Sequence, residues 1–157
     1  MRPMTFEFFV PGVPRPGGSK TATVIRRKGG EIVMQNGRPM TTTREAGKYT
    51  AHWRADVREA ARIAMGEHPP LSGALGLQVV FRFVRPKGHY RANGALKQDA
   101  PKFRAARPDT TKLLRALEDA LTGLVWLDDA QVVRQSASKE YDSDRPGAHV
   151  SVSVMGA

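Results

Sequence analysis

The sequence contains no cysteine, which excludes a disulfide scaffold, a thiolate zinc site and a cysteine nucleophile. Its four histidines stand far apart without metal-ligand spacing, which argues against a zinc enzyme. No apolar run is long enough to span a bilayer. The first residues also lack the apolar stretch and the small-residue cleavage site of a signal peptide. We therefore expect a cytoplasmic protein that has no membrane partner.

Acidic residues are in short supply as well. There are 15 Asp and Glu against 25 Lys and Arg, which gives a net charge of +10 at pH 7. Counterion release draws so basic a protein to polyanions, whatever their sequence. Ribosomal and membrane-surface proteins are also basic, so the charge favours a nucleic-acid partner without establishing one.

The basic residues gather in two segments, at about 14–47 and 86–108, which are also rich in proline and glycine. Between Arg82 and Arg107 there are eight Lys and Arg against one acid. Weak apolar periodicity predicts a long loop there, and long loops in compact domains are usually functional or disordered. In the other segment, 21–25 and 31–34 are expected to pair as a hairpin. The alternative is two solvated loops that only keep the protein soluble.

Nucleic-acid contacts are expected mainly from these two segments and from the helix that follows the second one. His89 and Tyr90 add rings that can stack on bases among the cations. The side chains that we expect to bind DNA are Lys20, Arg85, Lys87, His89, Tyr90, Lys97, Lys102, Arg107 and Lys112.

Apolar periodicity predicts an α+β fold. Period-two alternation or dense apolar runs indicate four strands, and a 3.6-residue spacing indicates two main helices. We expect the strands at 5–10, 76–84, 132–141 and 150–154, and the helices at 48–65 and 110–121. Neither an internal repeat nor a second domain is evident, so 1–157 is expected to form one domain. Its mixed sheet of four or more strands would pack against the two helices.

Three acids stand out because of where they lie. Asp109 precedes the helix at 110–121, and Asp128 and Asp129 follow it. A nuclease needs carboxylates that converge on a divalent ion, and these acids can meet only if a later strand runs back alongside the helix. The alternatives are a helix cap for Asp109 and an ordinary turn for Asp128 and Asp129. Two adjacent like charges nevertheless need something to offset their repulsion, either a bound cation or nearby arginines.

The sequence around these acids resembles a known signature. The stretch RPDTTKLLRALEDAL at 107–121, followed by WLDDAQVV at 126–133, is similar to that of RusA-type Holliday junction resolvases. The segments at 10–20 and 83–90 are similar to phage-type members. The resemblance implies a homodimeric endonuclease that needs Mg²⁺, with Mn²⁺ as a substitute, and no small-molecule cofactor. Such an enzyme resolves four-way DNA junctions by paired nicking.

The resemblance also implies roles for individual residues. Asp109 and Asp129 fall on the catalytic acids, with Asp128 beside them, and all three are the expected metal ligands. Arg115 stands at the position of the family's essential lysine. An arginine there keeps the positive charge but changes its geometry.

One position departs from the family pattern. The family usually has a second acid two residues after the first, where this chain has Thr111. Thr111, Arg115 and Glu118 share one helix face, so Glu118 is either a substitute metal ligand or an ion-pair partner of Arg115.

The sequence therefore leaves different functions open. The first is the endonuclease, and the second is a branched-DNA-binding protein whose catalysis is weakened by the loss of the acid at Thr111. A basic RNA-binding structural protein is a weaker third, because the adjacent Asp128 and Asp129 have no evident purpose there.

Overall fold

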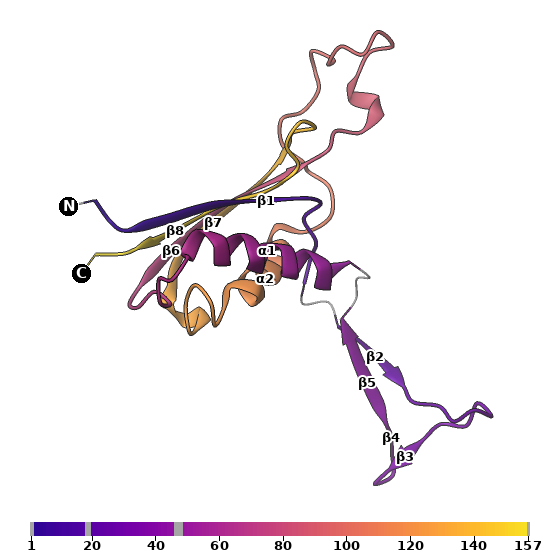
Figure 1. Cartoon of the computed structure of the whole chain (residues 1–157). Coiled ribbons are helices and arrows are strands. Elements are labelled where there is room, and N and C mark those ends of the chain that lie inside the picture. Colours follow the sequence, from indigo (N-terminus) through magenta and orange to yellow (C-terminus); the bar gives the residue numbers. More distant parts are fainter. Residues whose placement is uncertain (1, 18–19, 46–48, 157) are drawn as a thin grey trace.

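The computed structural model describes residues 2–17, 20–45 and 49–156, without the side chains of 20–22 and 43–45. A four-stranded sheet packs against two helices, and two basic segments extend from this domain (Figure 1). The elements are β1 (Thr5–Pro11), β2 (Lys20–Val24), β3 (Met34–Gln35), β4 (Arg38–Pro39), β5 (Thr41–Glu45), α1 (Thr50–Met65), β6 (Leu75–Phe83), η1 (Lys87–His89), α2 (Thr110–Leu121), η2 (Asp129–Gln131), β7 (Val132–Tyr141) and β8 (Gly147–Val154). Among the described residues, no helix is both long and apolar enough to cross a membrane.

The sheet is mixed. Its strand order is β1-β8-β6-β7, in which β6 and β7 are parallel and the other neighbours are antiparallel. Parallel neighbours need a crossover, and the chain between β6 and β7 supplies it through the basic loop, α2 and η2. The predicted α+β class is confirmed.

The core forms between the sheet and the inner faces of the helices. β6 is buried along most of its length, as its dense apolar run predicts. From α2, Leu113, Leu117 and Leu121 are fully buried, and from α1 Trp53 and Val57 pack into the same cluster. Both ends of the predicted helix at 110–121 are confirmed, because a strong apolar stripe coincides with clear boundary residues.

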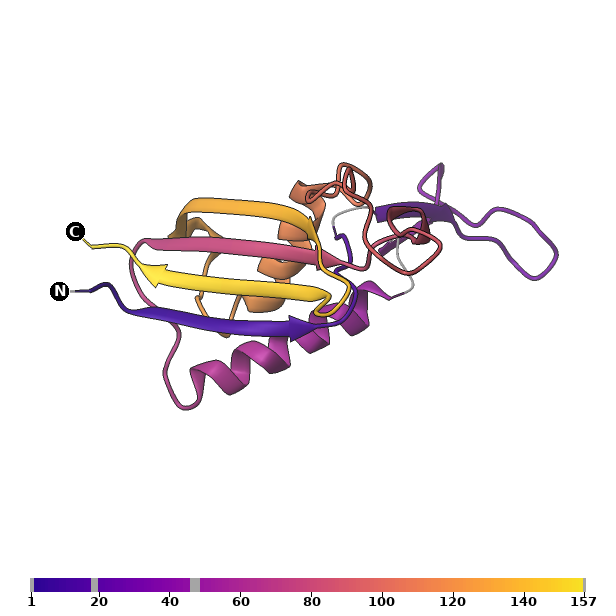
Figure 2. The ribbon, with the colours of Figure 1, turned by 90° about the horizontal axis from the view of Figure 1, so that it is seen from above.

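A two-stranded arm, residues 20–45, carries the first basic segment away from the sheet and the helices (Figure 2). The predicted hairpin of 21–25 with 31–34 is confirmed only next to its turn, where Arg26 bridges Ile32 and Val33 N–H donates to the Ile25 carbonyl. The strand before it, β2, pairs with β5 instead. Between them the chain makes two turns rather than one. The second turn, at Asn36–Gly37, has positive φ at both residues and closes the short β3–β4 hairpin. The return strand therefore begins only at Thr41.

The second basic segment, residues 86–108, is a long loop, as predicted, and is here called the basic loop. It begins with the short 3-10 helix η1 and returns along the outer side of β7, where Phe103 bridges Glu140. Figures 1 and 2 both show that the arm and the basic loop leave the domain at the same end of the sheet. This end also contains the start of α2.

Candidate nucleic-acid interface and acidic sites

The N-terminus of α2 opens into a hollow of about 460 Å³ between the bases of the arm and the basic loop. Its walls include four cations, Arg15, Arg104, Arg107 and Lys112, and one acid, Asp109. The unpaired backbone N–H groups of the first helical turn and the helix dipole add positive potential. This basic hollow has the charge and size to hold a phosphate group.

The wall of the basic hollow is fixed by its own hydrogen bonds. The Arg104 guanidinium donates to the Arg107 carbonyl at 2.7 and 3.0 Å and stacks over the Phe83 ring at 4.7 Å. Lys139 Nζ donates to the carbonyls of Ala106 and Pro108 at 2.7 and 2.9 Å. These contacts hold the chain that leads into α2 before any ligand binds, which lowers the cost of ordering the site.

Asp109 occupies the N-cap position of α2, but its carboxylate makes no capping hydrogen bond. The side chain is 62% exposed and lies 3.9 Å from Lys112 Nζ. Helix capping therefore does not explain why an aspartate stands at this position. Its carboxylate faces the basic hollow and can act on whatever occupies it.

Asp128 has a local role. Its carboxylate accepts from the Ala130 backbone N–H at 2.8 Å, and Gln131 Oε1 accepts from the Asp128 and Leu127 backbone N–H groups. This reciprocal arrangement is a capping box for η2. The turn interpretation thus describes Asp128, whose carboxylate is occupied by the backbone.

Asp129 points to different partners from those of Asp128. Its Oδ1 accepts from the Thr122 hydroxyl and, at 3.1 Å, from the Trp126 indole N–H. Trp126 is fully buried, so the carboxylate is tied to the core just beyond the C-terminus of α2. Sequence reasoning missed Thr122 and Trp126 as positioning residues. The signal was a bulky aromatic residue three positions before an acid in a turn.

Glu118 lies close to Asp129, since the Thr122 hydroxyl contacts both the Glu118 backbone carbonyl, at 2.9 Å, and Asp129 Oδ1. Burial raises the pKa of the Glu118 carboxyl, and the negative charges of Asp129 and Asp119 raise it further, while Arg115 opposes them. The positive charge of Arg115 thus lowers the pKa of Glu118, but by less than burial and the neighbouring acids raise it. Glu118 and Asp129 form a carboxylate pair whose crowded negative charge favours a proton or a cation.

The predicted convergence of Asp109, Asp128 and Asp129 does not occur within one chain. Among the described residues, no group of three or more acids or histidines could hold a metal ion. Nine positions along α2 put Asp109 about 13 Å from the level of Glu118, at about 1.5 Å per residue. β7 does run back alongside α2, but Asp128 and Asp129 precede that strand and stay at the far end of the helix.

A second hollow, of about 350 Å³, lies between α2 and β7 on the flank that joins the two ends of the helix. Thr111, Arg115 and Glu118 line it from α2, and Gln135 and Ser136 line it from β7. Thr111 thus stands at the end near Asp109, and Glu118 stands at the end near Asp129. Arg115 lies between them and is exposed.

The predicted DNA-binding residues divide into two groups. The exposed ones are Lys87, Lys97, Lys102, Arg107 and Lys112. The half-buried ones, Arg85, His89 and Tyr90, hold the basic loop together. Arg85 donates to the Pro101 carbonyl at 2.8 Å and lies 3.3 Å from His89 Nδ1, and the Tyr90 hydroxyl pairs with Ser143 at 2.9 Å. The side chain of Lys20 lies outside the described part of the chain.

Two cations of the basic hollow, Arg15 and Arg104, were missed by the sequence prediction. Arg15 precedes a Pro-Gly-Gly stretch and stacks over the Tyr49 ring at 5.1 Å. Arg104 is one of many cations in the basic loop, and only the return of the loop along β7 distinguishes it. Their positions depend on tertiary structure rather than on local pattern.

Comparison with known families agrees with the resemblance. The family model of Endodeoxyribonuclease RusA matches residues 18–153. No curated protein gives a significant match. The matched range covers most of the chain and includes the arm, the basic loop, α2 and the acids at both of its ends. The chain therefore belongs to the RusA family of endodeoxyribonucleases, which resolve Holliday junctions.

Proposed function

We propose that this protein is a Mg²⁺-dependent, homodimeric endonuclease that resolves four-way DNA junctions by paired nicking. The observation that carries the proposal is the basic hollow at the N-terminus of α2. There, four cations and the N-terminus of α2 surround the exposed carboxylate of Asp109. A phosphate of the DNA backbone would occupy the hollow, close to an acid that capping does not use.

The DNA would extend from the basic hollow over the two basic segments. Lys87, Lys97 and Lys102 are exposed on the basic loop, and Arg107 and Lys112 lie at its end. Contacts of this kind set position and affinity rather than sequence preference. Binding should therefore be strongly salt-dependent and should not need a metal ion.

The carboxylate pair of Glu118 and Asp129 is the proposed place for Mg²⁺, or for Mn²⁺ as a substitute. Mg²⁺ in phosphoryl-transfer sites is commonly held by one or two carboxylates together with substrate phosphates and water, so two protein acids fit it. Bound there, the ion would activate a water and stabilise charge on a phosphate that lies along the flank of α2, about 13 Å from the one in the basic hollow. Trp126 and Thr122 would keep Asp129 oriented, and Arg115 would contact a phosphate from the same flank of α2.

The decisive experiment incubates the protein with a synthetic four-way junction, with and without Mg²⁺ or Mn²⁺. Paired nicks that appear only with the metal ion are expected. Sedimentation of the free protein should give the mass of a dimer, since paired nicks need two sites. Glu7→Gln, which changes an exposed acid on β1, the sheet edge opposite β7, is the matched control and should cleave normally. A junction that stays intact with either ion would contradict the enzyme.

One observation favours a second candidate, a branched-DNA-binding protein with weakened catalysis. Thr111 stands where the family usually has an acid, on the flank between the basic hollow and the carboxylate pair. Thr111→Asp separates the two candidates. If Glu118 has taken over the missing role, the added acid should leave cleavage unchanged or reduce it. If the site lacks a ligand, the variant should cleave faster than the native protein.

A further inference from the structure

Two large apolar side chains are exposed on the arm. Ile32 is 42% exposed and Met34 is 56% exposed. Figures 1 and 2 show that the arm extends away from the sheet and from both helices, so the domain does not cover them. The proposed function so far assigns neither residue a role.

Their exposure does not result from poor packing of the arm. Ile25, Val33 and Met40 are half-buried, and backbone hydrogen bonds join their segments of the arm. Val33 N–H donates to the Ile25 carbonyl at 2.9 Å, and Met40 N–H donates to the Val33 carbonyl at 2.8 Å. Successive side chains of an extended chain point to opposite sides, so Ile32 and Met34 face outward while Val33 faces inward. The two outward residues lie about 7 Å apart on one side of the arm.

The charges around these residues indicate an anionic partner. Arg27, Lys28 and Arg38 are exposed close to them along the arm, against the single acid Glu31. Arg26 donates to the Gly30 carbonyl at 2.9 Å and so fixes the first turn. Apolar side chains among cations are the combination by which proteins insert wedges between base steps while they hold the flanking phosphates.

We propose that the tip of the arm binds the open centre of branched DNA, with Ile32 and Met34 packed against unstacked bases. Arg27, Lys28 and Arg38 would contact the phosphates around them. This inference rests on the proposed function and adds a basis for substrate choice. A wedge must unstack the bases of a linear duplex, whereas a branch point already offers exposed base faces. The arm would thus favour junctions over linear DNA without reading a sequence.

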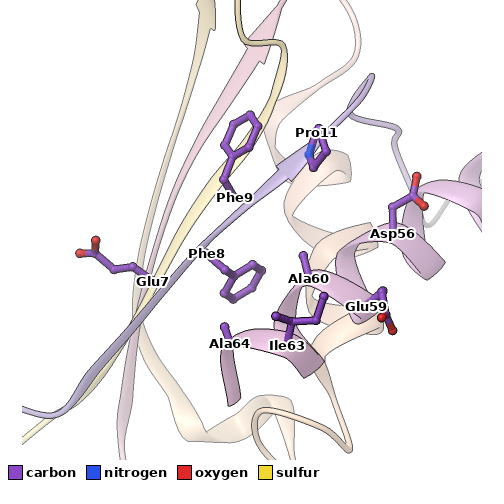
Figure 3. A pocket seen from close by; sticks show the side chains of 9 residues that line it. All are labelled: Glu7, Phe8, Phe9, Pro11, Asp56, Glu59, Ala60, Ile63 and Ala64. Carbon is purple, nitrogen blue, oxygen red and sulfur yellow. The ribbon is translucent and has the colours of Figure 1, made fainter. Parts of the chain in front are cut away.

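A second copy of the chain is the competing partner for the arm. A groove between β1 and α1 has an apolar floor of Phe8, Ala60 and Ile63, with acids at its margin (Figure 3). Only one of its three acids, Asp56, is left to face the cations of the arm, however. Glu59 is bound by Arg62 at 2.7 and 2.9 Å, and Glu7 points to the opposite side of β1 from Phe8. DNA is the better match for the cations of the arm.

The test measures binding without a metal ion, so that cleavage plays no part. A junction with 2-aminopurine at its centre should brighten when the native protein binds, because the base loses its stacking. In the double variant Ile32→Ser, Met34→Ser the brightening should be lost. The ratio of junction affinity to linear-duplex affinity should fall about tenfold, the scale of one lost base contact. Arg27→Ala with Lys28→Ala should instead weaken binding to both DNAs alike.

Ile63→Ser is the matched control, since Ile63 is 68% exposed but lies in the groove rather than on the arm. It should leave the ratio and the fluorescence unchanged. An unchanged ratio in the double serine variant would overturn the wedge while leaving the proposed function intact. A native protein that binds neither DNA would overturn both.

Because the chain has no cysteine, the competing partner can be tested directly. Met34→Cys and Ile63→Cys, made in separate chains, are mixed and oxidised without DNA. The wedge requires that no specific disulfide joins the two chains. An efficient disulfide between them, with none between Met34→Cys and a control Leu127→Cys chain, would assign the arm to the groove and overturn the wedge.

Discussion

The two ends of α2 carry opposite chemistry. At its N-terminus, Asp109 is surrounded by cations in the basic hollow. Beyond its C-terminus, Asp129 is held by Trp126 and Thr122, and Glu118 adds a second carboxylate nearby. The first end is suited to a phosphate and the second to a cation. Acids close to one helix therefore need not form one site, because the helix itself keeps them apart.

The largest effect is expected from Asp129→Asn. Loss of a carboxylate from the proposed metal site should reduce junction cleavage at least about a hundredfold, while metal-free binding stays the same or becomes tighter. Asp109→Asn should instead leave Mg²⁺ affinity unchanged, because Asp109 lies at the other end of α2. Calorimetric titration of both variants with Mg²⁺ checks this difference. An equal loss of Mg²⁺ binding in the two would show that the ends act as one site.

Arg104→Ala should have the next largest effect and tests the basic hollow. The variant loses two hydrogen bonds to Arg107 and a stacked ring, so junction affinity should fall about tenfold and stability by about 1–2 kcal/mol. Arg104→Lys keeps the charge but not the two-pronged donor geometry. If charge alone mattered, the lysine variant would bind like the native protein. Gel shifts and thermal melts of both variants separate charge from position.

A smaller effect is expected from Lys97→Ala combined with Lys102→Ala on the basic loop. Both side chains are exposed, so junction affinity should fall severalfold and the melting temperature should hardly change. The slope of log affinity against log salt should become shallower by about 0.9 for each lost phosphate contact. A clear drop in melting temperature would instead assign these lysines to the support of the loop.

The smallest effect is expected from Glu118→Gln. Because burial and neighbouring acids raise the pKa of Glu118, its negative charge is unfavourable in the folded chain. Removal of that charge should raise stability by up to about 0.5 kcal/mol in the absence of divalent ions. Added Mg²⁺ should then stabilise the native protein more than the variant. Equal stabilisation of the two by Mg²⁺ in thermal melts would remove Glu118 from the metal site.

The sequence was most informative where local pattern decides the structure. α2 has the predicted bounds because its apolar periodicity is strong and its flanking residues end it. β7 also has the predicted bounds. In the arm, the partner of β2 was mispredicted, because 21–25 and 31–34 both favour strands but the extra turn at Asn36–Gly37 brings β5 beside β2. Which of two candidate strands pairs with a third depends on the turns between them.

The candidate site was predictable in its parts but not in its arrangement. The motif residues identified Asp109, Asp128 and Asp129, yet not which carboxylates would be occupied locally. The capping bond of Asp128 and the indole contact of Asp129 distinguish two adjacent and chemically identical residues. The length of α2 was available from the sequence, and at about 1.5 Å per residue it already predicts that Asp109 lies far from Asp129.

The path of the basic loop along β7 has a consequence for solubility. β7 is an edge strand, and edge strands with free backbone groups can pair with other chains and start aggregation. Arg104 N–H donates to the Lys139 carbonyl at 2.9 Å, and Tyr141 N–H donates to the Lys102 carbonyl at 2.9 Å. The loop thereby occupies the outer edge of the last residues of β7. A shortened loop would expose this edge to a neighbouring chain, so the segment that supplies cations also protects the sheet.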